Sequence, residues 1–143
     1  MSILIQNGVL VLPDGPQRAD LRVDEDKMVQ LGPSLPAGDS RVLDAAGKLV
    51  FPGLIDTHTH FEMNKGLANE TADDWFTGTR AALAGGTTTV LDFAEPERGC
   101  SLASALETWH GRADGKACCH YGFHMTIKDW EIGRAHVRTP VTY

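Results

Sequence analysis

The first fifty residues alternate short apolar stretches with residues that favour turns. Short runs rich in Val, Ile and Leu, bounded by Gly, Pro, Asn or Asp, are typical of β-strands. The strands expected from this pattern are residues 3–6, 9–12, 20–24, 28–31 and 41–44. Asn7-Gly8 predicts a tight hairpin between the first two, and residues 13–16 predict a second turn. Because its strands are few and short, this β-rich module is not expected to close by itself.

From residue 49 onward the pattern changes to alternating strands and helices. Apolar and β-branched runs predict strands near residues 54–60, 87–93 and 118–125, and helical spacing predicts helices near 72–84 and 102–111. Residues 71–74 resemble a capping box at the start of the first helix, and Gly85-Gly86 is expected to end it. Ser101 is expected to cap the second helix, which Gly111 closes. This order predicts an α/β fold built from βα units around a parallel sheet.

The architecture that this pattern begins is larger than the chain. A complete (β/α)8 barrel takes roughly 250 residues, whereas the chain has 143. We therefore expect an incomplete (β/α)8 TIM barrel, its first three βα units, over residues 51–130, and interpret the chain as the N-terminal part of a longer protein. Residues 131–143 lack a helical or strand period and are more basic than the rest. We interpret them as a non-native tail, resembling a translated sequencing linker, in which His136 has no function.

Composition and charge argue against several function classes. Hydrophobic residues make up 42% of the chain, charged residues 22%, and the net charge is −6. Lys and Arg are outnumbered and never clustered, which argues against a nucleic-acid or anionic-membrane surface. No run of about 18 apolar residues is present, and the N-terminus lacks the features of a signal peptide. Cys100, Cys118 and Cys119 are odd in number and make no disulfide framework, so we expect buried thiols and a cytoplasmic protein.

The candidate chemistry lies in the segment from Phe51 to His60. Alternate side chains of a β-strand point to the same face, so Asp56, His58 and His60 would share one face of a strand over residues 55–60. Two imidazoles on one rigid edge can form half of a divalent-metal site, with the carboxylate placed to orient one of them. An isolated His-x-His is more often solvated or packed. The preceding Pro-Gly turn, the apolar lead-in and Asp56 favour metal ligation here.

This segment resembles the metal-binding first barrel strand of the amidohydrolase superfamily. Residues 70–93, Ser101-Leu102 with Trp109, and residues 121–125 with Trp130 are similar to its dihydropyrimidinase and hydantoinase branch. The resemblance implies a (β/α)8 barrel joined to a small β-sandwich domain, of which residues 1–50 supply the N-terminal part. It also implies a homo-oligomer, since this branch tends to tetramers.

The resemblance further implies a binuclear zinc (Zn²⁺) centre and a reaction. The reaction is hydrolysis of a cyclic amide, which opens dihydropyrimidines or hydantoins to N-carbamoyl amino acids. His58 and His60 would be ligands of one ion. The other ligands, a carboxylated lysine, two histidines and an aspartate, belong to later strands, so the present piece is expected to be inactive. Met63 would line the apolar side of the substrate pocket, although a solvated loop explains it equally well.

Several other polar residues are expected to have supporting roles. Lys116 and Lys128 lie in the wrong places for the bridging lysine of the family. His120 and His124 fall on one face of the third strand, and we expect packed or hydrogen-bonded roles for both. Asp92, at the end of the second strand, is expected to support loop geometry or a hydrogen bond.

Two alternative functions share the same His-x-His pattern. A dihydroorotase or allantoinase-type enzyme would differ in the substrate-binding residues of later strands. A non-catalytic dihydropyrimidinase-like protein would keep the barrel as an oligomeric scaffold. Retention of both His58 and His60 argues against the scaffold, because metal-free relatives lose ligands.

Overall fold

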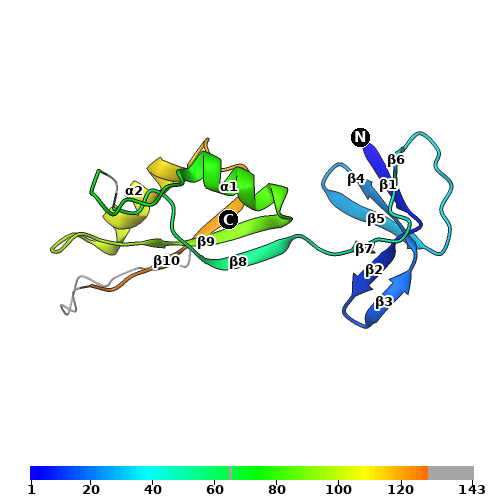
Figure 1. Cartoon of the computed structure of the whole chain (residues 1–143), viewed down its shortest axis with the longest axis horizontal. Coiled ribbons are helices and arrows are strands. Elements are labelled where there is room, and N and C mark those ends of the chain that lie inside the picture. The colour runs from blue at the N-terminus through cyan, green and yellow to red at the C-terminus, as the bar shows by residue number, and fades with distance from the viewer. Residues whose placement is uncertain (65, 129–143) are drawn as a thin grey trace. The chain divides into compact units, whose positions relative to one another are not determined.

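Strands dominate the first part of the chain, and strands alternate with helices in the second part. The computed structural model describes residues 1–64 and 66–128 and is a mixed α/β protein (Figure 1). The chain divides into two units, Met1–Pro52 and Gly53–Tyr143, which are called unit 1 and unit 2 and are described separately. Trp130, His136 and the predicted non-native tail lie outside the described residues.

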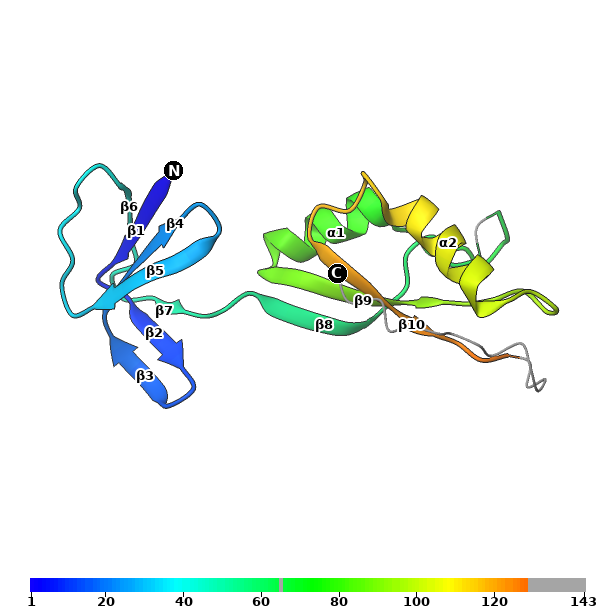
Figure 2. The same ribbon diagram turned by 180° about the vertical axis from the view of Figure 1, so that it is seen from behind.

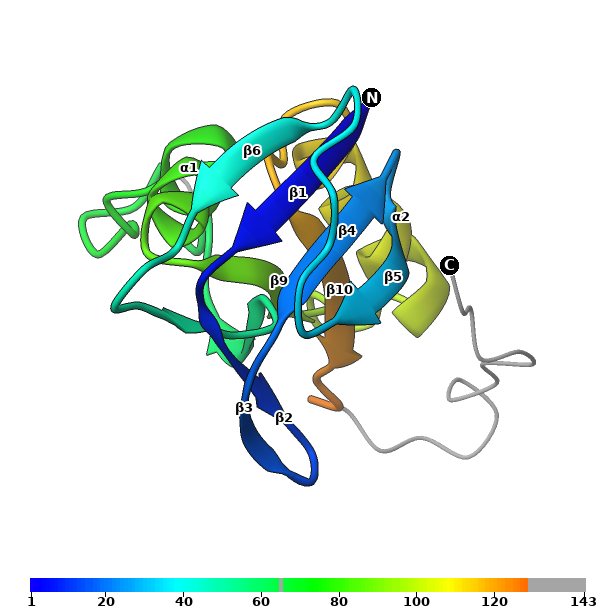
Figure 3. The same ribbon diagram turned by 90° about the vertical axis from the view of Figure 1, so that its right-hand side faces the viewer.

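Unit 1 contains two small sheets. Its strands are β1 (Ser2–Gln6), β2 (Val9–Leu12), β3 (Gly15–Arg18), β4 (Asp20–Asp24), β5 (Lys27–Gly32), β6 (Arg41–Asp44) and β7 (Leu49–Val50). One sheet has the order β5-β4-β1-β6 (Figure 3), and the other has the order β3-β2-β7 (Figure 1). The five strands expected from the sequence are confirmed, whereas β3 and β7 were not expected.

The hairpin predicted at Asn7-Gly8 is wrong. The strands on its two sides belong to different sheets, because β1 pairs with β4 and β6 while β2 pairs with β3 and β7. Asn7 has a φ of +65°, its N–H donates to Asp20 Oδ1 at 3.1 Å, and its side-chain amide donates to Asp44 Oδ1 at 2.9 Å. These two carboxylates hold the chain where it passes from one sheet to the other. The second predicted turn is confirmed, since Leu12 pairs with Gly15.

Unit 2 is a three-stranded parallel sheet covered by two helices. Its elements are β8 (Leu54–Thr59), α1 (Trp75–Ala84), β9 (Thr87–Ala94), α2 (Leu102–Ala113) and β10 (His120–Met125). The strand order is β10-β9-β8 with all neighbours parallel. Both helices lie on the same face of the sheet (Figures 1 and 2). The type and order of all five elements are confirmed.

The helix ends differ in part from the sequence prediction. Helix α1 starts later than expected, because its N-cap is Asp74, which forms a capping box with Thr77. Thr71 instead accepts a hydrogen bond from the Met63 N–H at 3.0 Å. The predicted end at Gly85 and the Ser101 cap of α2 are both confirmed. Helix α2 continues two residues past Gly111 to Ala113.

The core of unit 2 is aromatic and lies between the sheet and the helices. Its buried members are Phe61, Trp75, Val90, Ala94, Trp109 and Ala113. The rings of Phe61 and Trp75 have centroids 5.0 Å apart. Phe61 follows the two candidate histidines directly, so this packing anchors the chain just after them. The expected burial of the cysteines is wrong for Cys100 and Cys118, which are exposed free thiols at the ends of loops rather than on core-facing positions.

Candidate metal centre

The two predicted ligands lie close together at the end of β8, where His58 is on the strand and His60 directly follows its last residue, Thr59. The ring centroids of His58 and His60 lie 5.2 Å apart, and the ring planes are nearly perpendicular at 82°. Both rings pack against Phe93 of β9, with centroid distances of 4.5 Å and 5.2 Å. His58 is exposed, and the side chain of His60 is 32% exposed. An aromatic platform therefore supports both imidazoles while leaving them accessible.

The spacing of the two rings fits a shared zinc ion. With zinc–nitrogen bonds of about 2.1 Å, a ring centroid lies roughly 3.2 Å from the ion, so two imidazoles at the tetrahedral angle have centroids about 5.2 Å apart. His58 and His60 have this separation. In the part of the chain that the structure describes, no group of three or more His, Cys, Asp or Glu side chains is arranged to hold a metal ion.

Asp56, the predicted orienting carboxylate, makes a local backbone contact. Its Oδ1 accepts a hydrogen bond from the His58 backbone N–H at 3.1 Å. The pairing of β8 with β9 shifts register between Asp56 and Thr59. This stretch is therefore less regular than the ideal strand that the sequence pattern predicts. An orienting role of Asp56 toward an imidazole ring stays a prediction.

Asp92 is the carboxylate that faces a candidate ligand. It is 1% exposed, and its Oδ1 lies 3.8 Å from His60 Nδ1. Oδ2 accepts a hydrogen bond from the Phe61 N–H at 2.9 Å, and Oδ1 accepts one from the Phe93 N–H at 2.5 Å. Burial raises the pKa of Asp92, while these N–H groups and the nearby His60 and Arg112 act in the opposite direction. The predicted hydrogen-bonding role is confirmed, whereas nothing in the sequence pattern indicated the contact with His60.

Three of the other polar residues named in the sequence analysis, His124, Lys116 and Lys128, have polar partners in the structure. His124 Nε2 lies 3.0 Å from the Thr57 carbonyl oxygen, and its ring packs on Phe93 at 4.8 Å, which confirms the role expected for it. The packed role expected for His120 is wrong, because His120 is exposed at the start of β10. Lys116 Nζ lies 3.8 Å from Glu62 Oε1, and Lys128 Nζ lies 2.6 Å from Glu95 Oε2.

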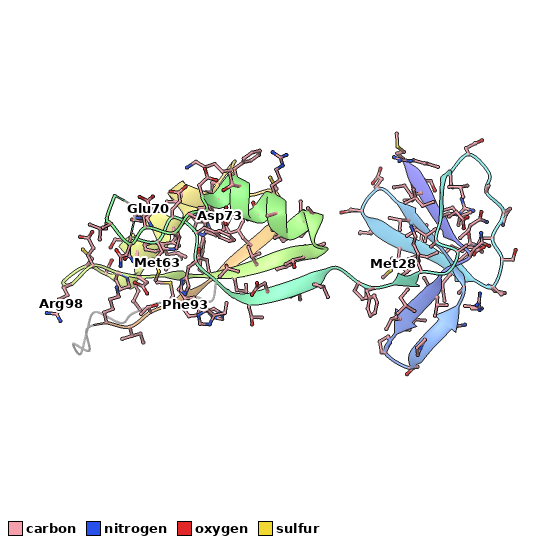
Figure 4. All side chains as sticks on the ribbon, viewed as in Figure 1. Met28, Met63, Glu70, Asp73, Phe93 and Arg98 are labelled. Carbon is pink, nitrogen blue, oxygen red and sulfur yellow. The ribbon has the colours of Figure 1, made fainter. Side chains whose placement is uncertain are left out.

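Met63 lies in the loop that leaves β8 (Figure 4). Its side chain is half-buried. Its N–H donates to Thr71 Oγ1 at 3.0 Å, and its carbonyl accepts the Thr71 N–H at 3.1 Å. These two hydrogen bonds tie the loop to the segment before α1. That Met63 lines a substrate pocket stays a prediction.

Neither helix of the described residues has the length and apolar character needed to span a membrane.

Comparisons with known proteins agree with one another. The family model for the amidohydrolase family matches residues 49–130. The dihydropyrimidinase of Rattus norvegicus is 47% identical over 133 residues, which cover 90% of this chain and 25% of that protein. The D-hydantoinase of Ralstonia pickettii is 46% identical, with 90% of this chain and 28% of that protein covered.

A solved structure shares the fold. The crystal structure of dihydropyrimidinase from Brevibacillus agri NCHU1002 matches with a TM-score of 0.86 and 44% identity, over 92% of this chain and 28% of that one. The chain thus spans about a quarter of the length of the curated relatives it matches. The family match covers more than half of the chain, and it includes the strand that carries His58 and His60. The chain belongs to the amidohydrolase family and is homologous, within it, to the dihydropyrimidinases and D-hydantoinases.

Proposed function

We propose that this chain supplies the first metal ligands of a zinc-dependent cyclic amidohydrolase. In the proposal, residues 51–130 are the first part of a (β/α)8 barrel, and residues 1–50 contribute to a β-sandwich. The protein opens dihydropyrimidines or hydantoins to N-carbamoyl amino acids. The observation that carries the proposal is the 5.2 Å separation of the His58 and His60 rings, at the end of β8 in a parallel sheet. The relatives named dihydropyrimidinase and D-hydantoinase support the reaction class.

Each residue of the site has a distinct task in this proposal. His58 and His60 hold one ion of a zinc pair, and Phe93 fixes the tilt of both rings from behind. A bound Zn²⁺ ion polarises a carbonyl group and lowers the pKa of water. Because a catalytic zinc ion ordinarily has three protein ligands, the remaining ligands come from outside the described residues. Met63, at the start of the following loop, forms an apolar wall for the group carried by the substrate ring.

Metal titration of the chain tests the ligand assignment. We expect the chain to bind Cu²⁺, the divalent ion that nitrogen ligands hold most tightly, and Zn²⁺ more weakly, by calorimetry. His58→Ala and His60→Ala should each lose this binding. His120→Ala is the matched control, since His120 is exposed on β10 and is not one of the two proposed ligands. Equal binding by His58→Ala and the unchanged chain would contradict the assignment.

Turnover is tested in a chimera that completes the barrel. Residues 1–128 replace the matched quarter of the Ralstonia pickettii D-hydantoinase, with which this chain shares 46% identity. We expect the chimera to open hydantoin or dihydrouracil, measured as N-carbamoyl product, and to lose turnover when metal is removed with a chelator. His58→Ala in the chimera should abolish turnover. A folded, metal-loaded chimera without any ring opening would favour the non-catalytic scaffold instead.

A further inference from the structure

We infer that Asp92 is a positioning residue that holds His60 in the tautomer with hydrogen on Nδ1 and a free electron pair on Nε2. The inference rests on the proposed function only for its purpose, which is to present Nε2 to a metal ion. The evidence is the direct approach of the Asp92 carboxylate to the His60 ring, from the neighbouring strand.

The backbone places the two groups next to each other. In the pairing of β8 with β9, Thr59 lies opposite Asp92, so Asp92 sits beside the end of the strand that carries the histidines. The Phe61 N–H at 2.9 Å and the Phe93 N–H at 2.5 Å hold its two oxygens. A carboxylate tied by both oxygens and 1% exposed has little freedom to rotate. Its Oδ1 is thereby directed to His60, with 3.8 Å to Nδ1.

The chemistry of the two groups then selects one tautomer. An ionised carboxylate only accepts hydrogen bonds, and a neutral imidazole has one N–H and one bare nitrogen. The ring nitrogen nearest Asp92 is Nδ1, at 3.8 Å, which is longer than a hydrogen bond, so we infer that electrostatic attraction to the carboxylate favours the tautomer with hydrogen on Nδ1. Nε2 is left with its electron pair. Carboxylates that orient metal-binding histidines in this way commonly raise metal affinity by about 10–100-fold.

Asp56 is the competing candidate for this task. It lies on β8 with His58, but the hydrogen bond that it accepts comes from the His58 backbone N–H. It is also exposed to solvent, whereas Asp92 is buried. A contact across the sheet, rather than one along the strand, therefore positions the ring.

The tautomer of His60 is directly measurable in the whole chain. Nitrogen NMR of the chain with ¹⁵N-labelled histidine distinguishes the two tautomers, at a pH above 7.5 where an ordinary imidazole, with a pKa of about 6.5, is neutral. We expect His60 in the Nδ1–H form without any metal added. Asp92→Asn, nearly the same in shape, should shift His60 toward the Nε2–H form and weaken Cu²⁺ binding by about 10–100-fold. Asp14→Asn, in an exposed turn of unit 1, is the control and should leave both readouts unchanged, while Asp56→Asn tests the competing candidate and should leave the His60 tautomer unchanged. An Nε2–H form of His60 in the unchanged chain overturns the inference even if Asp92→Asn fails to fold.

Failure of this inference and failure of the proposed function give different results. If His58→Ala loses Cu²⁺ binding but Asp92→Asn alters neither tautomer nor affinity, the positioning role is wrong and the metal site stands. If the unchanged chain binds no metal but His60 is Nδ1–H and depends on Asp92, the positioning role is supported and the proposed site is wrong. If Asp56→Asn, rather than Asp92→Asn, changes the tautomer, Asp56 takes the role and the inference is overturned.

Discussion

At the scale of single residues, the buried carboxylate Asp20 ties together three segments of unit 1. It accepts hydrogen bonds from the backbone N–H groups of Leu35 and Asn7 at 3.0 Å and 3.1 Å. These bonds, that from Leu35 first, lower its pKa below the ordinary value of 3.8. A carboxylate with a depressed pKa in the folded state stabilises the fold above its unfolded pKa. That stabilisation is lost as the pH falls below about 3.9 and through the folded-state pKa.

Replacement of Asp20 by Asn should make unit 1 less stable at pH 7 and less sensitive to acid. The charge that strengthens both hydrogen bonds is removed, and an unfavourable change of about 1–3 kcal/mol is expected in the free energy of unfolding. The measurement is urea unfolding followed by the amide NMR signals of Leu4 and Leu21, at pH 7 and pH 3. Tryptophan fluorescence does not serve, because the tryptophans of the chain all follow residue 52. Asp14→Asn, in an exposed turn, is the control. If the free energy of unfolding changed between pH 7 and pH 3 by the same amount in Asp20→Asn as in the unchanged chain, this role of Asp20 would be contradicted.

The residues of the site differ in how far the sequence could predict them. His58 and His60 are two positions apart, so the period of a strand is enough to bring them together. Asp92 lies 31 residues after Phe61, the residue whose N–H it accepts. Contacts across a sheet depend on register, which local pattern does not specify when both strands are apolar. The sequence pattern therefore indicates Asp56, the nearest carboxylate along the chain, as the orienting group.

At the scale of elements, two helical glycines in unit 2 have opposite surroundings. A Cβ atom on Gly78 of α1 would lie 2.2 Å from Cε1 of Phe61, which is itself buried against Trp75. A Cβ atom on Gly111 of α2 would have no neighbour within 4 Å. The same substitution is thus expected to act in opposite directions on the two helices.

Gly78→Ala should destabilise unit 2 by about 1–3 kcal/mol, the usual range for overpacking a core. Gly111→Ala should stabilise it by about 0.5–1 kcal/mol, since alanine restricts the unfolded chain and favours helix. Both are measured as shifts of the urea midpoint in tryptophan fluorescence, which reports the surroundings of Trp75 and Trp109. Each variant serves as the control for the other. Stabilisation by both variants would show that helix propensity, rather than the contact with Phe61, decides the outcome.

Element types were predictable, but their partners and ends were only partly so. Apolar runs and helical spacing located the strands and helices of unit 2 because these signals are local. The Asn7-Gly8 signal was misleading, since Asp20 and Asp44, both distant in sequence, hold Asn7 between two sheets. The start of α1 was misplaced because Thr71 and Asp74 are both good N-caps. The hydrogen bond between Thr71 and Met63 removes the first of them from that role.

At the scale of the whole molecule, the sheet of unit 2 ends in two strands that pair on one side only within the described residues. These are β8 and β10. Open edges with apolar side chains are templates for pairing with another chain. On β8, Leu54 is 56% exposed and Ile55 is 63% exposed. We therefore expect the chain to self-associate as its concentration rises.

Ile55→Lys should reduce this self-association, because a charged side chain on an edge strand opposes pairing with a second edge. Sedimentation velocity over a concentration series measures the effect. Leu67→Lys is the matched control: Leu67 is 62% exposed, almost the same as Ile55, but lies in a loop rather than on an edge. Equal suppression by both variants would point to general solubility instead of edge pairing.

The 143-residue chain alone should not hydrolyse hydantoin or dihydrouracil. Two histidine ligands fall short of the three protein ligands of a catalytic zinc site. The assay is product formation by the purified chain with Zn²⁺ added, beside the chimera at the same concentration of sites. A chain that opens the ring in a metal-dependent way by itself would refute the division of the site proposed here.

The pairing of β1 with β6 has a consequence for folding during synthesis on the ribosome. Ile3 is synthesised well before its parallel partner Arg41, which lies later in the chain. At about 5–20 residues per second, roughly 2–8 s pass between the synthesis of β1 and that of its parallel neighbour β6. During that time Leu4, which is completely buried in the folded chain, can make non-native contacts. Molecular chaperones that shield nascent apolar segments should therefore bind β1 until β6 has been synthesised.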